Sequence, residues 1–144
     1  MRVRPVAAIL TSCLVAVPCG FAMAQQDSTA KPATPAAYSA EQATRGADVY
    51  RGQCSACHLP KDHYSADFQQ AWGGRTVKAL YDYIRSTMPD DAPGELTEQQ
   101  YLDATAYILK LNGMPAGELP LTSDTLQLKK FTIDIKPRTP APLR

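Results

Sequence analysis

The pentapeptide Cys54-Ser55-Ala56-Cys57-His58 constrains this chain more than any other feature, because it places two thiols and an imidazole in one short stretch. At this spacing both thiols can add to the two vinyl groups of a haem as thioethers, and the histidine that follows is held beneath the iron. A fold built on such a motif has to surround a large, flat and apolar group. The pentapeptide therefore predicts one covalent haem, attached through Cys54 and Cys57 and ligated by His58.

Two other kinds of site also use cysteines at this spacing, and the surrounding sequence argues against both. In a thioredoxin-like redox pair a strand precedes the cysteines and a helix follows, whereas here a predicted helix precedes the motif and a loop follows it. A structural zinc site needs four ligands, and the only nearby candidates are Cys54, Cys57, His58 and His63, with no second ligand pair further along. Haem attachment is the favoured interpretation.

Residues 1–24 are typical of a signal peptide. They begin with Arg2 and Arg4, continue through an apolar run and end in Ala22-Met23-Ala24, a small-residue cleavage site. One alternative is an uncleaved membrane anchor, although the apolar run is short for a bilayer span and is interrupted by a proline and a glycine. The other is lipoprotein cleavage before Cys13, although the apolar region ahead of that cysteine is unusually short.

Cleavage would change two counts that bear on function. Of the 4 cysteines, Cys13 and Cys19 would be removed, which leaves Cys54 and Cys57 as the cysteines exposed to an oxidising compartment. Two of the 15 basic residues would also be removed, against an unchanged 14 acidic residues. With a net charge near −1, the mature chain would lack the basic field that binding to nucleic acid or to an anionic membrane requires.

The composition and the apolar pattern divide the chain into four segments. These are a signal peptide at 1–24, a disordered linker rich in alanine and proline at 25–37, a helical domain at 38–121 and a C-terminal extension at 122–144.

Three principal helices are predicted within the domain, from apolar positions at helical spacing and from capping signals. They cover residues 40–53, residues 76–87, and a stretch that starts after Thr97 and stops at Asn112-Gly113. A domain of about a hundred residues with so few helices would bury only a small core by itself, and a large apolar cofactor would fill it.

The remaining stretches are expected to lack helices. Between His58 and Gly74 the chain should be irregular, because Pro60, Gly73 and Gly74 act as breakers. Alternating apolar residues over 119–135 predict an extended segment lying back on the domain. The predicted fold class is therefore mainly α, with three principal helices around one haem and an extended C-terminal segment.

The sixth iron ligand decides whether the iron carries electrons or binds small molecules. Met88 lies in the loop after the second helix, far enough from His58 for the chain to pass from one haem face to the other. Met114 follows the third helix, where a methionine can simply fill a gap in the core. His63 is so close to His58 that the chain would have to be fully stretched, so it is expected to be a surface residue. Met88 is the expected ligand.

Further motifs accompany the pentapeptide along the domain. They are Glu41-Gln42-Ala43 with Arg45-Gly46 and Tyr50, Trp72-Gly73-Gly74-Arg75-Thr76, Thr87-Met88-Pro89 with Ala92-Pro93-Gly94, Ala106-Tyr107-Ile108-Leu109, and Asn112-Gly113-Met114-Pro115-Ala116-Gly117. With these motifs, residues 38–121 resemble the small class I c-type cytochrome domains. The resemblance is to those associated with bacterial dehydrogenases that depend on pyrroloquinoline quinone (PQQ).

The resemblance implies how the first and third helices pack. Gly46 and Tyr50 would place the first helix across the third near Ala106 and Tyr107, since glycine lets two backbones approach closely. It also implies that Met88 is the distal ligand.

The resemblance further implies that Trp72 and Arg75 bind the haem, by facing its propionates. An indole N–H and a guanidinium can each donate to a carboxylate. A core tryptophan and a solvated arginine are the alternative. The stretch from His58 to Trp72 departs from the family pattern, because it is shorter and lacks the usual Gly-rich segment with a proline opposite the proximal histidine. Pro60 could provide that contact instead.

The sequence as a whole predicts a periplasmic electron-transfer protein with one haem c and no catalytic residues. The expected donor is a quinoprotein dehydrogenase, either separate or with this chain as its cytochrome subunit, and the expected acceptor is an oxidase or another cytochrome. No nucleic acid partner and no membrane span after signal cleavage are expected. The alternative function is a ligand-binding or peroxidase-like haem protein with a labile sixth ligand.

Overall fold

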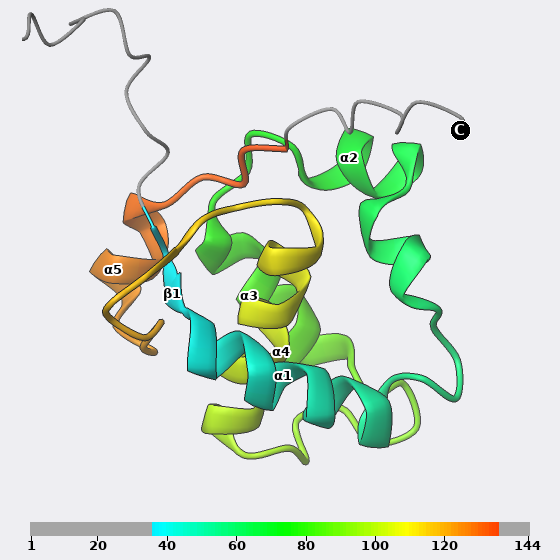
Figure 1. Cartoon of the computed structure of the whole chain (residues 1–144). Coiled ribbons are helices and arrows are strands. Elements are labelled where there is room, and N and C mark those ends of the chain that lie inside the picture. The colour runs from blue at the N-terminus through cyan, green and yellow to red at the C-terminus, as the bar shows by residue number, and fades with distance from the viewer. Residues whose placement is uncertain (1–35, 136–144) are drawn as a thin grey trace, which may run out of the picture. The chain divides into compact units, whose positions relative to one another are not determined.

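The computed structural model describes residues 36–135. The predicted signal peptide, most of the predicted linker and the end of the C-terminal extension lie outside the described residues. The described part is mainly α, as predicted (Figure 1), and none of its helices is long and apolar enough to cross a membrane. In chain order the helices are α1 (Ala40–Gln53), the 3-10 helix η1 (Pro60–Tyr64), α2 (Ala66–Trp72), α3 (Val77–Thr87), α4 (Glu98–Leu111) and α5 (Thr125–Lys130).

The three helices predicted from the sequence are present as α1, α3 and α4, and each begins at a side-chain cap. The Ser39 hydroxyl accepts the backbone N–H of Gln42, and the Thr76 hydroxyl accepts that of Ala79. At α4, Thr97 and Gln100 form the complete predicted capping box. Because such caps satisfy backbone donors at only one register, they fix where each helix starts.

The prediction of an irregular stretch between His58 and Gly74 is wrong, because η1 and α2 lie within it. Pro60 occupies the first turn of η1, where a missing N–H has no effect on helical hydrogen bonds. Ser65 caps α2 by accepting the N–H of Phe68, and Gly73 ends it. The supposed breakers are therefore at the helix ends.

The prediction of an extended C-terminal segment is also wrong in part. Asp124 caps the short helix α5, in which Leu126 is 78% exposed and Leu128 is completely buried. The two leucines therefore alternate in exposure, as the sequence pattern predicts, but they do so because they lie on opposite sides of a helix and not on opposite faces of a strand. Beyond α5 the chain is extended, and Thr132 forms an isolated antiparallel bridge with Thr76.

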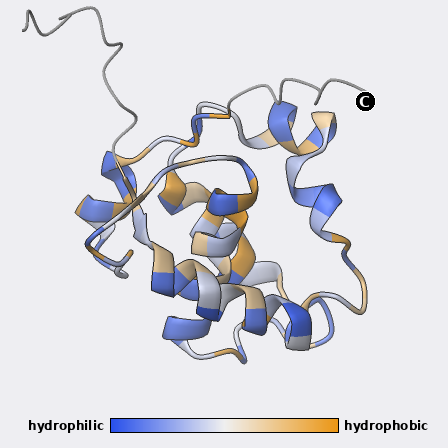
Figure 2. Ribbon diagram, in the orientation of Figure 1, coloured by the Kyte–Doolittle hydropathy of each residue, from blue (hydrophilic) through white to orange (hydrophobic). Residues whose placement is uncertain are grey.

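The hydrophobic core lies between α1, α3, α4 and α5. In Figure 2 the central helices carry more of the hydrophobic colour than α1 does. A parallel pair of two-residue strands, β1 (Tyr38–Ser39) and β2 (Ala116–Gly117), joins the start of the domain to the segment after α4. Leu128 and Ile133, which lie in the predicted extension, are buried in the same core as the helices. The extension thus contributes to the folded domain.

The closest backbone approach in this core is between α1 and α4. A Cβ atom built on Gly46 would lie 1.9 Å from the backbone oxygen of Asp103 and 2.9 Å from the Cβ of Tyr107. The rings of Tyr50 and Tyr107 pack 5.3 Å apart, one turn further along. The expected crossing at Gly46 and Tyr50 is therefore present, with Asp103 in contact with the glycine where Ala106 was expected.

A buried carboxylate ties the same two helices together. Arg45 of α1 donates to Asp103 of α4 through Nε at 3.0 Å and Nη2 at 3.1 Å, and Gln99 Nε2 donates to the same carboxylate at 2.7 Å. The Asp103 side chain is 5% exposed, while that of Arg45 is 53% exposed.

We expect Arg45→Met to lower the free energy of unfolding by about 1–2 kcal/mol, because the buried Asp103 carboxylate would keep only one neutral donor. The estimate is modest because Arg45 is half exposed and solvent screens its charge. Arg51→Met is the matched control on α1, since the Arg51–Asp48 pair is exposed on both sides, and it should change stability by less than about 0.5 kcal/mol. Guanidinium denaturation of both variants measures the difference, and equal losses would contradict it.

Candidate functional site

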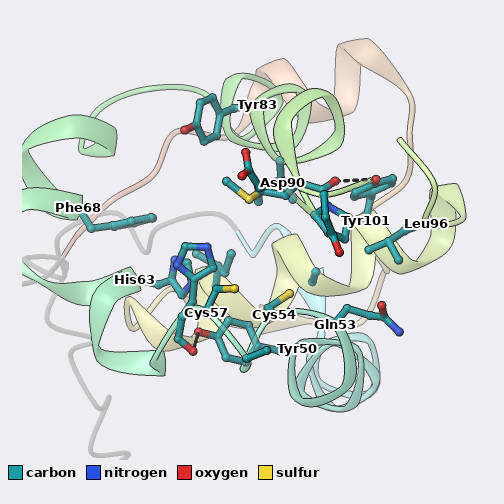
Figure 3. A pocket seen from close by; sticks show the side chains of 18 of the residues that line it. Tyr50, Gln53, Cys54, Cys57, His63, Phe68, Tyr83, Asp90, Leu96 and Tyr101 are labelled. Atoms are coloured by element: carbon teal, nitrogen blue, oxygen red, sulfur yellow. Dashed lines mark hydrogen bonds between the residues drawn. The ribbon is translucent and has the colours of Figure 1, made fainter. Parts of the chain in front are cut away.

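A cavity of about 620 Å³ opens between the end of α1, the η1–α2 segment, the loop after α3, and α4. In Figure 3, Cys54, Cys57 and Tyr50 lie on one side of it, with Tyr83 and Asp90 on the opposite side. Much of the wall is apolar and comes from α2, α3, α4 and the loop before α4. These wall residues include Phe68, Trp72, Ile84, Leu96, Ala104 and Ile108.

The pentapeptide lies at the C-terminal end of α1 and continues its coil for one more turn. The N–H of Cys54 donates to the Tyr50 carbonyl at 2.9 Å, and the N–H of His58 donates to the Cys54 carbonyl at 2.9 Å. The Tyr50 hydroxyl also donates to the His58 carbonyl at 3.0 Å. Cys54, Cys57 and His58 all line the cavity, and both thiols are free. The predicted attachment residues are thus together at one wall.

Burial shifts the pKa values of two ionisable groups at this wall. It raises the pKa of Tyr50 to about 12, with smaller contributions from Cys54 and other neighbours. The phenol therefore stays protonated at neutral pH and keeps the proton that it donates to the His58 carbonyl. Burial also raises the pKa of the Cys54 thiol.

Of the two candidate methionines, one lines the cavity and the other does not. Met88 follows the end of α3 and is part of the cavity wall together with the pentapeptide. Met114 is 4% exposed and belongs to the hydrophobic core. Its backbone carbonyl accepts the Tyr38 hydroxyl at 2.6 Å.

His63, expected to be a surface residue, is only partly exposed. His63 lines the cavity, and its Nε2 atom is buried without a hydrogen-bond partner among the described residues. Its ring lies 5.4 Å from that of His58, and Asn112 of α4 donates to its backbone carbonyl at 2.7 Å. Burial, followed by the neighbouring His58, lowers the pKa of His63. The η1 turn, which was not predicted from the sequence, places this ring at the cavity wall.

The two residues expected to face the haem propionates are in different positions. Trp72, the last residue of α2, lines the cavity. Arg75 is exposed, and its guanidinium carbon lies 4.6 Å from the centre of the Trp72 ring. Arg75 is not part of the cavity wall but stacks on a residue that is.

Other wall residues were not identified as functional from the sequence. Phe68 of α2 lies 5.9 Å from the His63 ring and 6.3 Å from the Trp72 ring. Tyr101 of α4 also lines the cavity. The signal that could have found Phe68 is the Ser65 cap, followed by Phe68 and Trp72 at helical spacing.

The residues of this cavity fit a covalent haem. The wall offers two adjacent free thiols, a histidine beside them, a methionine, and a large apolar surface from several helices. His63 lines the same cavity, and its buried Nε2 has no hydrogen-bond partner among the described residues. A histidine with a methionine is one of the ligand pairs that hold haem iron in cytochromes c. The described residues contain no group of three or more His, Cys, Asp or Glu side chains that could hold a metal ion.

Comparison with known proteins gives one match. Residues 41–108 match the family model described as cytochrome c oxidase, cbb3-type, subunit III. No curated protein and no solved structure gives a significant match. The matched range includes α1, the pentapeptide, the cavity wall and most of α4. Residues 41–108 of this chain therefore correspond to a cytochrome c domain, a kind of domain that carries covalent haem c and typically serves as an electron carrier.

Proposed function

We propose that this protein is a periplasmic one-electron carrier whose haem is attached through Cys54 and Cys57, with His58 and Met88 as axial ligands. The observation that supports this assignment is that both thiols, His58 and Met88 line the same cavity. When bound, haem c supplies an iron that alternates between the ferrous and ferric states.

The chain's own residues would set the properties of that iron. A methionine ligand raises the reduction potential relative to a second histidine. The Tyr50 hydroxyl, bonded to the His58 carbonyl, would hold the proximal side of the site. The apolar wall would exclude water, and with both axial positions filled by side chains no position would remain for a substrate. Trp72 is proposed to face a propionate, with Arg75 held beside it by stacking.

We further propose a donor and an acceptor. The motifs shared with cytochrome domains of PQQ-dependent enzymes support a quinoprotein dehydrogenase as the donor, with this chain as a free carrier or a bound subunit. The matched family is named for an oxidase subunit, which supports a terminal oxidase as the acceptor. Purification of the native protein from periplasm tests this proposal, because a bound subunit would co-purify with a large catalytic partner.

Replacing each methionine by leucine tests the ligand assignment. We expect Met88→Leu to lose the weak red absorption band of sulfur-to-iron charge transfer and to turn the ferric iron high-spin, because leucine has no donor atom. Met114→Leu is the matched control. It conserves volume in the core, so it should cost less than about 1.5 kcal/mol of stability and leave the spectrum unchanged.

Two results would contradict this assignment. Loss of the band in Met114→Leu but not in Met88→Leu would transfer the ligand role to Met114. A high-spin spectrum in the unmodified protein would favour the ligand-binding or peroxidase-like alternative.

A further inference from the structure

We infer that Tyr101 is a positioning residue that holds the Met88 loop closed against the cavity. This inference rests on the proposed role of Met88 as the distal ligand. Tyr101 lies in the first turn of α4, is completely buried, and lines the cavity.

The Tyr101 hydroxyl contacts the loop at two places. It donates its proton to the Met88 carbonyl at 2.8 Å and accepts the backbone N–H of Gly94 at 2.9 Å. Figure 3 shows the first of these hydrogen bonds beside the cavity. One hydroxyl thus joins both ends of the 88–94 loop to a helix of the core, using its single donor and one of its acceptor sites.

The other hydrogen bonds of this loop are local. Among the described residues, the N–H of Met88 donates to Ile84 of α3 at 2.9 Å, and the N–H of Ala92 donates to Pro89 within the loop at 3.0 Å. Neither of these bonds connects the loop to α4. Among the described residues, the Tyr101 hydroxyl is therefore the group whose hydrogen bonds hold the Met88 loop against α4.

This arrangement predicts a specific effect on ligand exchange. An external ligand could bind the ferric iron only after the Met88 side chain has moved away, and opening of the loop from α4 would allow that movement. Without the hydroxyl, the Met88 carbonyl and the Gly94 N–H would lose their partner in the closed loop but could be solvated in the open one. The open loop would then be populated more often.

Tyr101→Phe, made in the haem-loaded protein, tests the inference with imidazole as the probe. We expect its apparent affinity for imidazole to rise about five- to thirtyfold, which corresponds to the loss of one or two hydrogen bonds. Without imidazole the red charge-transfer band should remain. Tyr107→Phe on the same helix is the control and should change the affinity less than twofold, because Tyr107 makes no hydrogen bond to the loop in the described structure.

A second measurement separates loop positioning from general destabilisation. On heating, Tyr101→Phe should lose the red band at a temperature lowered by more than the lowering of its far-ultraviolet unfolding midpoint. Imidazole affinity equal to the unmodified protein, or two equal temperature shifts, would overturn the inference. Failure of the proposed function looks different, because Met88→Leu would then bind imidazole no more tightly than the unmodified protein.

Discussion

Gly46→Ala is expected to lower the free energy of unfolding of this domain by about 3 kcal/mol or more, although it adds a single methyl group. The added Cβ would lie 1.9 Å from the Asp103 backbone oxygen. Since that atom belongs to the α4 backbone, no change of side-chain rotamer can relieve the overlap. The two helices would have to separate, and the packing of Tyr50 against Tyr107 would be lost with them.

Gly52→Ala is the matched control on the same helix. A Cβ at Gly52 meets nothing within 4 Å, and alanine is favoured over glycine in a helix by about 0.5–1 kcal/mol. The two variants should therefore shift the guanidinium midpoint in opposite directions, when followed by far-ultraviolet circular dichroism at constant haem content. Equal midpoints for the two variants would show that α1 and α4 do not cross at Gly46.

The double variant Cys54→Ala with Cys57→Ala is expected to lose covalent haem completely. The reason is that both thiols at the wall of the cavity would be gone, and the other two cysteines, Cys13 and Cys19, lie in the predicted signal peptide. Intact mass measured on the exported protein should give the chain from Gln25 plus one haem for the unmodified protein, and the chain alone for the double variant. Without haem, a cavity of about 620 Å³ would also be left empty of its cofactor. The variant should therefore be far less stable than the unmodified protein.

Cys13→Ser with Cys19→Ser is the control for this experiment. Both cysteines lie in the predicted signal peptide, so the mature mass and the haem content should stay the same. Haem retained by the Cys54 and Cys57 double variant would refute the attachment. A measured mass that includes residues 1–24 would refute the cleavage site.

The parts of the fold that the sequence predicted well are those set by local chemistry. Capping residues next to periodic apolar positions located α1, α3 and α4, because a cap and a stripe depend only on neighbours in the chain. Helices η1, α2 and α5 were missed for a related reason. All three are short. Proline and glycine lie at the ends of η1 and α2 and suggest an irregular stretch, whereas in α5 the alternation of apolar residues suggests an extended one. A helix of one or two turns has little periodicity to detect.

The candidate site likewise contains residues that local sequence predicts and residues that it does not. The pentapeptide and Met88 could be selected from spacing and position alone, since each lies in a recognisable local sequence. The inward position of His63 depends on the η1 turn and on the hydrogen bond from Asn112, which is distant in sequence. The two bonds of the Tyr101 hydroxyl depend on how α4 lies against the preceding loop. Contacts of this kind are determined by tertiary packing and leave no periodic pattern in the sequence.

The bridge between Thr132 and Thr76 links the end of the described chain to the approach to α3. Around it, the N–H of Gly74 donates to Ile133, that of Ile133 donates to Arg75, and that of Val77 donates to Phe131. Amide hydrogens can exchange with solvent only when such bonds open. Because the same few bonds protect both segments, we expect their amide hydrogens to exchange together. Local opening of the C-terminal segment would also release the backbone that leads from Trp72 into α3.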